Sequence, residues 1–353
     1  MTGATRSEVH GLVLPGSAVV AGLFLVIGTV SADPAPYPQR TGGMGCIVEQ
    51  LTDSELDEYQ NRGVSQDGRF LAYVLREGFD ENGVPIATVF VRDLQSGENQ
   101  PIEADIDNSG AFSPDGRSMA IASHVDNGRT DILLLDLDTQ GVTPIAPHEQ
   151  WDWLPTFSPD GSTIVFNSYR VDGQADIFTY DLSSGALARH TDDPRYDAHG
   201  EFSPDGSKIL FNRMIAEKPE GGYDFEMFVI DLDSGTETQI SAGTPFEESY
   251  GSWAPDSAHV VFSSDQDGKP EKHNLYVLGP DGHIVARLTR GDWKDSYAYW
   301  SRDGAYIYFN SDRDGPDNIY RIPMNGLNCV RGGPIPGGAN NAQANGDADL
   351  DRS

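Results

Sequence analysis

Basic residues and cysteines are scarce in this sequence. It holds 24 Lys and Arg residues against 55 Asp and Glu residues, so the formal net charge at pH 7 is −31. A surface of this charge repels phosphate groups, which argues against nucleic acid or an anionic membrane surface as a partner. Two origins of the charge stay open, namely adaptation to a saline habitat and ordinary solubilisation through Asp-rich turns.

Long apolar runs are also absent, apart from one near the N-terminus. Residues 11–32 carry no charge, contain the run AVVAGLFLVIGTV and end in Val-Ser-Ala before Asp33. This order is typical of a signal peptide over residues 1–32, so we expect an exported protein, periplasmic or extracellular. An uncleaved anchor is the alternative, because the run is just long enough to span a bilayer. No membrane span is expected once the signal has been removed.

Most of the remaining chain repeats one stretch. TFSPDGSTIVFNS begins at Thr156, and five related stretches occur, the most divergent at Gly63. The spacing between copies is 45 to 51 residues, which is right for about four short strands. The turn aspartates of the six copies are Asp67, Asp115, Asp160, Asp205, Asp256 and Asp303.

The tetrapeptide at the centre of each copy predicts a hairpin turn. Pro159 presets φ, Asp160 can accept hydrogen bonds from the turn's N–H groups, and Gly161 tolerates positive φ. Four β-rich runs surround this turn, and nothing in the unit predicts a helix. The sequence therefore predicts an all-β, six-bladed β-propeller over residues 46–330, with four-stranded antiparallel blades and a core of the aromatic residues before the turns and in the second strands.

The last copy has no recognisable fourth strand. Residues 331–353 are rich in Gly, Asn and Asp, and we expect this tail to be disordered. Residues 46–52, CIVEQLT, match fourth-strand endings such as ALARHT, although they precede the first copy. We therefore predict that this N-terminal strand, preceded by a linker over 33–45, completes the last blade and closes the ring.

The two cysteines gain a meaning from this closure. If Thr52 is equivalent to Thr191, Cys46 and Cys329 flank the same turn of the last blade. In an exported protein we expect them to form a disulfide, with two free thiols as the alternative.

The repeat combines FSPDG, the apolar strand after it, a loop such as SDRDGPDNIY and the ending YDLSSG…ARHT. In these features it resembles the TolB-type β-propeller repeat. Propellers of this type occur as the binding half of TolB, in tricorn-type and prolyl-oligopeptidase-type proteases and in some pectin-degrading lyases. The sequence contains no G-x-S-x-G elbow after the propeller, so the resemblance does not imply peptidase chemistry. It implies an orphan propeller, without the N-terminal α/β domain of TolB or a hydrolase domain.

In five of the six copies a carboxylate occurs five residues before the last residue of the innermost strand. It can bond to backbone N–H groups at the strand entrance, or it can belong to a ring that converges on a hard cation or a cationic partner. No cofactor is required by any motif, and Ca²⁺ is the ion that such a ring would suit. The candidate metal ligands are Asp107, Asp152, Asp197, Glu248 and Asp295, with Asp57 and Glu58 near the sixth position.

The same rim carries aromatic residues that the repeat does not require. Their exposure beside acids is typical of a face that binds protein or sugar, and ordinary loop packing is the alternative. The candidate ligand-binding residues are Trp151, Trp153, Tyr196, His199, Tyr250, Trp293 and Tyr297.

No nucleophile and base stand at a recognisable spacing, so no catalytic residue is assigned. We therefore expect a monomeric, exported, non-catalytic binding or scaffolding module for a protein or an extracellular glycan. The alternative is an enzyme, a polysaccharide lyase or hydrolase with a metal or carboxylate site on this rim.

Overall fold

The computed structural model describes residues 39–41, 47–59, 63–79, 85–102, 110–124, 129–218, 223–241, 246–267 and 272–324. Within the unit formed by residues 36–353, these ranges contain 25 β-strands and no helix. Accordingly, the described part of the chain offers no helix long and apolar enough to cross a membrane.

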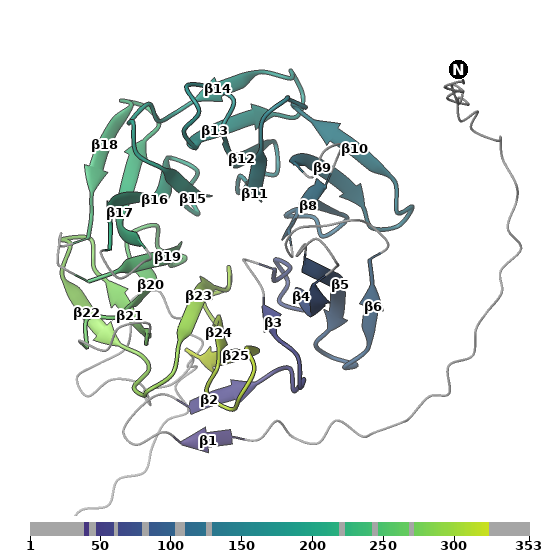
Figure 1. Ribbon diagram of the computed structural model, residues 1–353, viewed down its shortest axis with the longest axis vertical. Coiled ribbons are helices and arrows are strands. Elements are labelled where there is room, and N and C mark those ends of the chain that lie inside the picture. The colour runs from purple at the N-terminus through teal and green to yellow at the C-terminus, as the bar shows by residue number, and fades with distance from the viewer. Residues whose placement is uncertain are drawn as a thin grey trace, which may run out of the picture. The chain divides into compact units, whose positions relative to one another are not determined.

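The strands form six antiparallel sheets that surround a common axis as the blades of a propeller (Figure 1). Blade 1 consists of β3 (Glu58–Tyr59), β4 (Phe70–Phe79), β5 (Pro85–Asp93) and β6 (Asn99–Pro101). Blade 2 consists of β7 (Ala111–Phe112), β8 (Ser118–His124), β9 (Thr130–Asp136) and β10 (Val142–Ile145). Blade 3 consists of β11 (Asp152–Phe157), β12 (Thr163–Ser168), β13 (Asp176–Asp181) and β14 (Leu187–Arg189).

The other three blades repeat this order. Blade 4 consists of β15 (Asp197–Phe202), β16 (Lys208–Glu217), β17 (Tyr223–Asp231) and β18 (Thr236–Gln239). Blade 5 consists of β19 (Glu248–Trp253), β20 (Val260–Ser264), β21 (Asn274–Leu278) and β22 (Ile284–Arg287). Blade 6 consists of β23 (Asp295–Trp300), β24 (Tyr306–Ser311), β25 (Asn318–Pro323) and the N-terminal β2 (Ile47–Gln50). The predicted six-bladed, all-β propeller is thus confirmed.

Closure of the ring by an N-terminal strand is confirmed as well. β2 pairs with β25 through Glu49 opposite Arg321, and the two side chains form an ion pair of 2.7 Å. Thr52 accepts a hydrogen bond from the N–H of Ile319 at 2.9 Å, as Thr191 does from Ile177 at 3.0 Å in blade 3. The predicted equivalence of these two threonines therefore holds.

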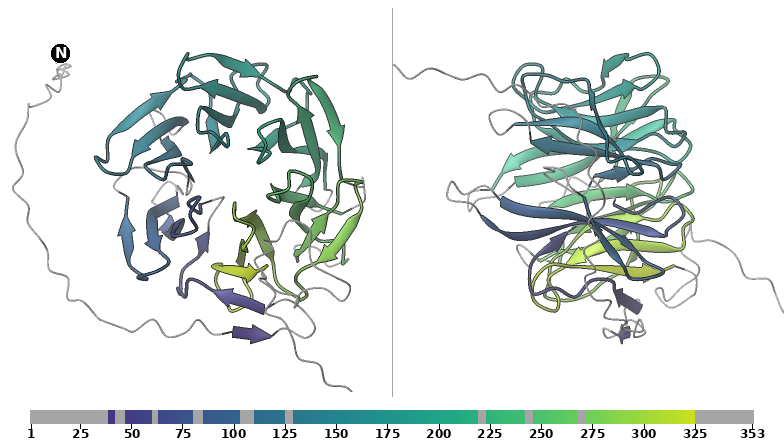
Figure 2. Two further views of the ribbon diagram at one scale, coloured as in Figure 1. Left: turned by 180° about the vertical axis from the view of Figure 1, so that it is seen from behind. Right: turned by 90° about the vertical axis from the view of Figure 1, so that its right-hand side faces the viewer.

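A further strand, β1 (Gln39–Thr41), pairs antiparallel with β2 on the outside of blade 6 (Figure 2). The sequence did not predict it, because its range was expected to be a linker. The signal peptide, the disordered tail, and the disulfide between Cys46 and Cys329 fall outside the described residues and stay predictions.

Each Ser-Pro-Asp-Gly turn is held by its own side chains. The Ser158 hydroxyl donates to Asp160 at 2.6 Å, and the N–H of Ser162 donates to the same carboxylate at 3.0 Å. Four other blades repeat the serine–aspartate bond at 2.6–2.7 Å, in the pairs Ser65–Asp67, Ser113–Asp115, Ser203–Asp205 and Ser301–Asp303. The hydroxyl and carboxylate are therefore part of the scaffold.

The blades pack through the aromatic residues predicted as core. The second-strand aromatics are almost completely buried, and so is the inter-blade Trp300. A cavity of about 80 Å³ lies where the six turns meet, and every blade contributes to its lining. We call this side of the ring the turn end, and the side where the innermost strands begin the entrance end.

Candidate functional site

The innermost strands of blades 3 to 6 share an irregular backbone near the entrance end. In each strand the pairing register shifts after the second residue, which marks a β-bulge. The third residue has positive φ, between 52° and 60°, although none of the four is glycine. A bulge re-aims side chains, and the residues that it re-aims here differ between blades: Leu154, His199, Tyr250 and Tyr297.

The three ring-bearing residues of this set contact one another. The rings of Tyr250 and Tyr297 lie 4.0 Å apart, and the imidazole of His199 meets Tyr250 edge-on at 4.9 Å. The proximity of Tyr297 and burial raise the pKa of Tyr250 well above its ordinary value. Tyr250 is therefore a neutral hydrogen-bonding group at physiological pH.

A second aromatic group lies beside them. Tyr196 is near Trp153 and Tyr169, each at 6.3 Å, and Phe225 meets its edge at 6.1 Å. Trp153 also contacts Tyr169 at 4.9 Å. Burial raises the pKa of Tyr196, so this phenol also stays protonated.

Both groups border a pocket of about 440 Å³ at the entrance end, which we call the entrance pocket. Blade 4 contributes most of its lining, and blades 3 and 5 contribute the rest. The lining residues are Tyr169, Gln174, Tyr196, His199, Asn212, Met214, Glu217, Tyr223, Phe225, Ser249 and Tyr250.

Three of the seven predicted rim residues line the entrance pocket, and four do not. Tyr196, His199 and Tyr250 line the entrance pocket, whereas Trp153 and Tyr297 pack behind it. Trp151 is 45% exposed and does not line the pocket. Trp293 lies over the guanidinium of Arg313 at 5.0 Å and donates a hydrogen bond to Asp295 at 3.1 Å.

Sequence reasoning missed the pocket residues that come from outside the innermost strands. Met214, Tyr223 and Phe225 belong to the β16–β17 hairpin, which is longer than the equivalent hairpins of blades 3, 5 and 6. A signal was present, because the spacing from Asp205 to Asp256 is 51 residues, the largest in the series. The extra residues lengthen this hairpin beyond the entrance of the innermost strand and form a wall of the pocket.

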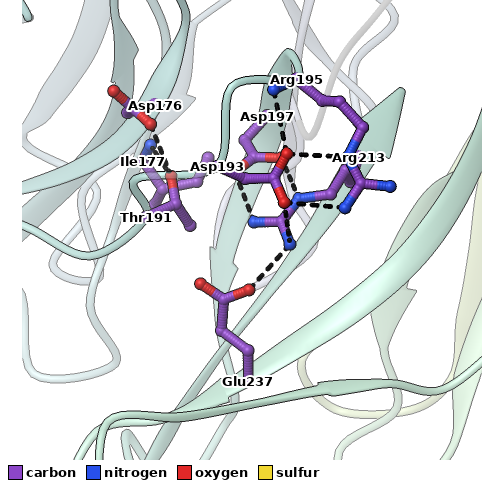
Figure 3. Close-up of polar contacts among 8 residues, drawn as sticks. All are labelled: Asp176, Ile177, Thr191, Asp193, Arg195, Asp197, Arg213 and Glu237. Carbon is purple, nitrogen blue, oxygen red and sulfur yellow. Dashed lines mark hydrogen bonds and ion pairs between the residues drawn. The ribbon is translucent and has the colours of Figure 1, made fainter. Parts of the chain in front are cut away.

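Three of the recurring carboxylates, those of Asp152, Asp197 and Asp295, are buried and paired with arginine. Asp197 is fully buried and receives two hydrogen bonds of 2.7 Å from Arg213, which also contacts Asp193 and Glu237 (Figure 3). Exposed Arg195 binds Asp193 from the other side, through two contacts of 2.7 Å. The paired guanidinium and carboxylate of Arg213 and Asp197 hold the start of the innermost strand β15 against β16.

Blades 3 and 6 use the same device. Arg170 binds Asp152 at 2.8 Å, and Arg313 binds Asp295 at 2.6 Å. Burial raises the pKa of Asp152 to about 6, against the opposing attraction of Arg170, and it raises that of Asp197 to about 6 as well. Of the two alternatives, local bonding at each strand entrance is closer to this geometry than a ring converging on a cation. The partners, however, are guanidinium groups rather than the expected backbone N–H groups.

The other carboxylates of the ring are also placed at strand entrances. Glu58 starts β3 and Glu248 starts β19, and both are buried. Burial raises the pKa of Glu58. Asp107 lies outside the described residues. Among the residues that the structure describes, no three His, Cys, Asp or Glu side chains form a group that could hold a metal ion.

The similarities to known proteins agree with the propeller fold. A family model for the TolB β-propeller domain matches residues 60–271. TolB from Acinetobacter baumannii is 21% identical with a TM-score of 0.55, over 78% of this chain and 59% of that one. The chain thus spans about three-fifths of the length of that TolB.

Two other solved structures are similar. An oligogalacturonate lyase in complex with manganese is 15% identical, with a TM-score of 0.56 over 81% of this chain and 96% of that chain. The β-propeller domain of the Trilobed protease from Pyrococcus furiosus, described as having an open velcro topology, is 17% identical with a TM-score of 0.54, over 77% and 86%. In contrast to that description, β2 and β25 pair here. At these identities the similarity shows a shared fold.

Proposed function

The chain belongs to the TolB β-propeller family, and from this premise we propose that it is an exported, non-catalytic binding module whose ligand occupies the entrance pocket. The observation that carries the proposal is the concentration of half-buried rings around one pocket of about 440 Å³. Such a volume is within the range of natural ligand sites. We propose that the partner is a protein or an extracellular glycan and that the module is a monomer.

The chemistry of the pocket suits binding. Tyr169, Tyr196 and Tyr250 keep part of their surface accessible, and each offers an apolar ring with a polar hydroxyl. Aromatic side chains of this kind dominate the energetics of protein interfaces and sugar sites, because they bury a large area at low entropic cost. Asn212, Gln174 and Ser249 add amide and hydroxyl groups that can fix the orientation of a ligand.

Polysaccharide lysis or hydrolysis is the alternative, and similarity to nearly the full length of an oligogalacturonate lyase favours it. The metal named for that lyase does not fit the residues found here, because the described residues contain no group of three potential ligands. We therefore derive no step through a metal. Binding of Ca²⁺ by the carboxylates at the entrance end remains a proposal, and calorimetric titration with Ca²⁺ tests it. A binding heat that the wild type gives and an Asp152→Asn, Asp197→Asn double variant does not give would support it.

Binding is tested with a glycan array and a peptide library, probed with the wild type and two variants. Tyr196→Ala removes a wall of the pocket and is expected to abolish retention of the ligand. Trp151→Ala removes an exposed aromatic outside the pocket and is the matched control, expected to bind as the wild type does. Equal retention by all three proteins would contradict the proposed site, and turnover of a uronic-acid polymer would support the enzyme instead.

A further inference from the structure

The walls of the entrance pocket meet at angles. Tyr169 and Tyr196 are inclined by 53°, Tyr196 and Phe225 by 69°, and Phe225 and Tyr223 by 67°. A flat stack would offer one binding face, whereas rings turned against one another offer faces and edges on several sides of the hollow. This arrangement suits a compact group that interacts with ring faces, and organic cations are such groups.

The pocket also lacks a permanently charged basic side chain. Its lining contains no lysine or arginine, and its single carboxylate belongs to the exposed Glu217. An anionic sugar such as a uronate would find no lysine or arginine as a counter-charge, and His199 is the single basic group of the lining. A cation would meet both the carboxylate and the negative field of a chain with a net charge of −31.

A second charged group lies along the same edge. Lys218, next to Glu217, is within 4 Å of three carboxylates, at 3.1 Å from Asp224, 3.5 Å from Glu247 and 3.8 Å from Asp265. Glu247 accepts a hydrogen bond from the pocket residue Ser249 at 3.2 Å. His273 lies 3.4 Å from Glu247, and even when it is protonated the three carboxylates exceed the two cations by one charge. The surroundings therefore reinforce the negative field.

The mouth of the pocket indicates the size of the partner. Tyr223, which lines the pocket, is 49% exposed, and Ile215, next in the chain to the lining residue Met214, is 37% exposed. Both belong to the long β16–β17 hairpin. Exposed apolar residues beside a pocket are typical of a surface that contacts a macromolecule, because a small ligand would leave them in water.

Resting on the proposed binding function, we infer that the entrance pocket receives a basic side chain, arginine in preference, from a positively charged segment of a partner protein. The guanidinium lies among the rings of Tyr196, Tyr223 and Phe225, and Glu217 neutralises its charge. Arginine is favoured over lysine because its planar group stacks on aromatic faces and is more weakly hydrated.

The test compares two capped pentapeptides that differ only at the central residue, arginine in one and citrulline in the other. Citrulline has nearly the shape of arginine but no charge, so the pair isolates the cationic contribution. The arginine peptide is expected to bind about tenfold more tightly in calorimetry at low salt. The difference is expected to shrink as the salt concentration rises.

Pocket variants locate the binding. Glu217→Gln removes only the exposed charge and is expected to weaken the arginine peptide severalfold without changing the citrulline peptide. Tyr223→Leu alters an exposed ring and keeps the test valid if Tyr196→Ala fails to fold. Trp151→Leu is the control and is expected to leave both affinities unchanged.

The possible outcomes distinguish failure of the arginine inference from failure of the proposed binding function. Equal affinity for the two peptides would overturn the inference, as would tight binding of choline alone, which would assign the pocket to small organic cations. A neutral glycan or peptide whose binding requires Tyr196 would overturn the inference and leave the binding function standing. If no ligand of any class depends on Tyr196 or Tyr223, both fall.

Discussion

The two ends of the propeller follow opposite rules. At the turn end, five blades repeat one serine–aspartate hydrogen bond to within 0.1 Å, at 2.6–2.7 Å. At the entrance end, one irregular backbone position carries Leu154, His199, Tyr250 or Tyr297 in successive blades. A residue that the fold needs recurs from blade to blade, so the positions that vary on a constant backbone indicate where a ligand is recognised.

The two ends also treat carboxylates differently. Hydrogen bonds from Ser158 and the turn N–H groups hold the pKa of Asp160 below its ordinary value, and the equivalent aspartates of blades 1, 2 and 4 behave alike. Burial raises the pKa of Asp152 and Asp197 to about 6. Hydrogen bonds at the turn end therefore stabilise the ionised form of its carboxylates. At the entrance end burial opposes ionisation, and the arginine partners offset part of that effect.

The largest effect is expected from Arg213→Ala. It leaves the fully buried Asp197 without its counter-ion, and breaking such a pair costs about 3–5 kcal/mol. Denaturant unfolding monitored by circular dichroism measures the loss. Arg195→Ala is the control, because Arg195 is 43% exposed and is expected to change stability by less than about 1 kcal/mol. Equal losses of stability in the two variants would contradict the view that the buried Arg213–Asp197 pair is what stabilises the entrance end.

A smaller and uniform effect is expected at the turn end. Asp160→Ala removes hydrogen bonds from Ser158 and Ser162, at a cost of about 1–2 kcal/mol in the free energy of unfolding. Asp115→Ala and Asp205→Ala are expected to lose about as much, because their turns share the serine and backbone N–H bonds. Asp138→Ala, at an exposed position with ordinary backbone angles, serves as the control. Unequal losses among the three turns would contradict their role as a repeated scaffold.

The dependence of stability on pH follows from the same contrast. The turn aspartates have lowered pKa values in the folded state, so their contribution is present above the unfolded value near 3.8 and is lost as the pH falls through the folded value. Asp152 and Asp197 titrate near 6 when folded, so the folded state binds more protons between pH 6 and 3.8, and their effect on stability improves as the pH falls across that window.

Together these groups predict a shallow stability maximum on the acidic side of neutrality. Unfolding free energies measured from neutral pH to about pH 3 should show it. Asp152→Asn is expected to reduce the rise in unfolding free energy between pH 6 and 3.8. Asp160→Asn is expected to reduce the loss of unfolding free energy at lower pH. A steady decline from pH 6 downward in the wild type would refute the assignment.

The smallest effect is expected at the one turn that lacks glycine. Ser257 has φ of 57°, a conformation that costs a residue with a side chain about 1 kcal/mol. Its hydroxyl accepts a hydrogen bond from the N–H of Asp205 at 3.1 Å, which offsets part of that cost. Ser257→Gly is therefore expected to shift the unfolding free energy by less than about 0.5 kcal/mol. A loss above 1 kcal/mol would show that the contact outweighs the strain.

Repetition explains what could be predicted. The turn chemistry, the number of blades and the equivalence of Thr52 with Thr191 all came from comparing copies, because each copy tests the others. The arginine partners left a trace of the same kind, since Arg170, Arg213 and Arg313 come shortly after the second-strand aromatics, in NSYR, FNR and NSDR. That trace was overlooked because a carboxylate and its partner lie 16 to 18 residues apart.

The pocket was predicted only in part, for the converse reason. Tyr169, Tyr223 and Phe225 occupy positions that other copies fill with unrelated residues, so comparing the copies does not single them out. Their approach to Tyr196 depends on how far the β16–β17 hairpin extends, and on the twist that brings neighbouring blades together. Both are properties of the assembled ring.

The pairing of β2 with β25 also has a kinetic consequence. Thr52 and Asn318, which share a hydrogen bond, are 266 residues apart, and Glu49 and Arg321 are 272 apart. Contacts of such sequence separation form late, because the chain between them must first be ordered. A newly made chain thus holds β2 without its partner β25 until the last blade exists. The facing edges of β2 and β25 are then the surfaces through which molecules with an unclosed ring would associate.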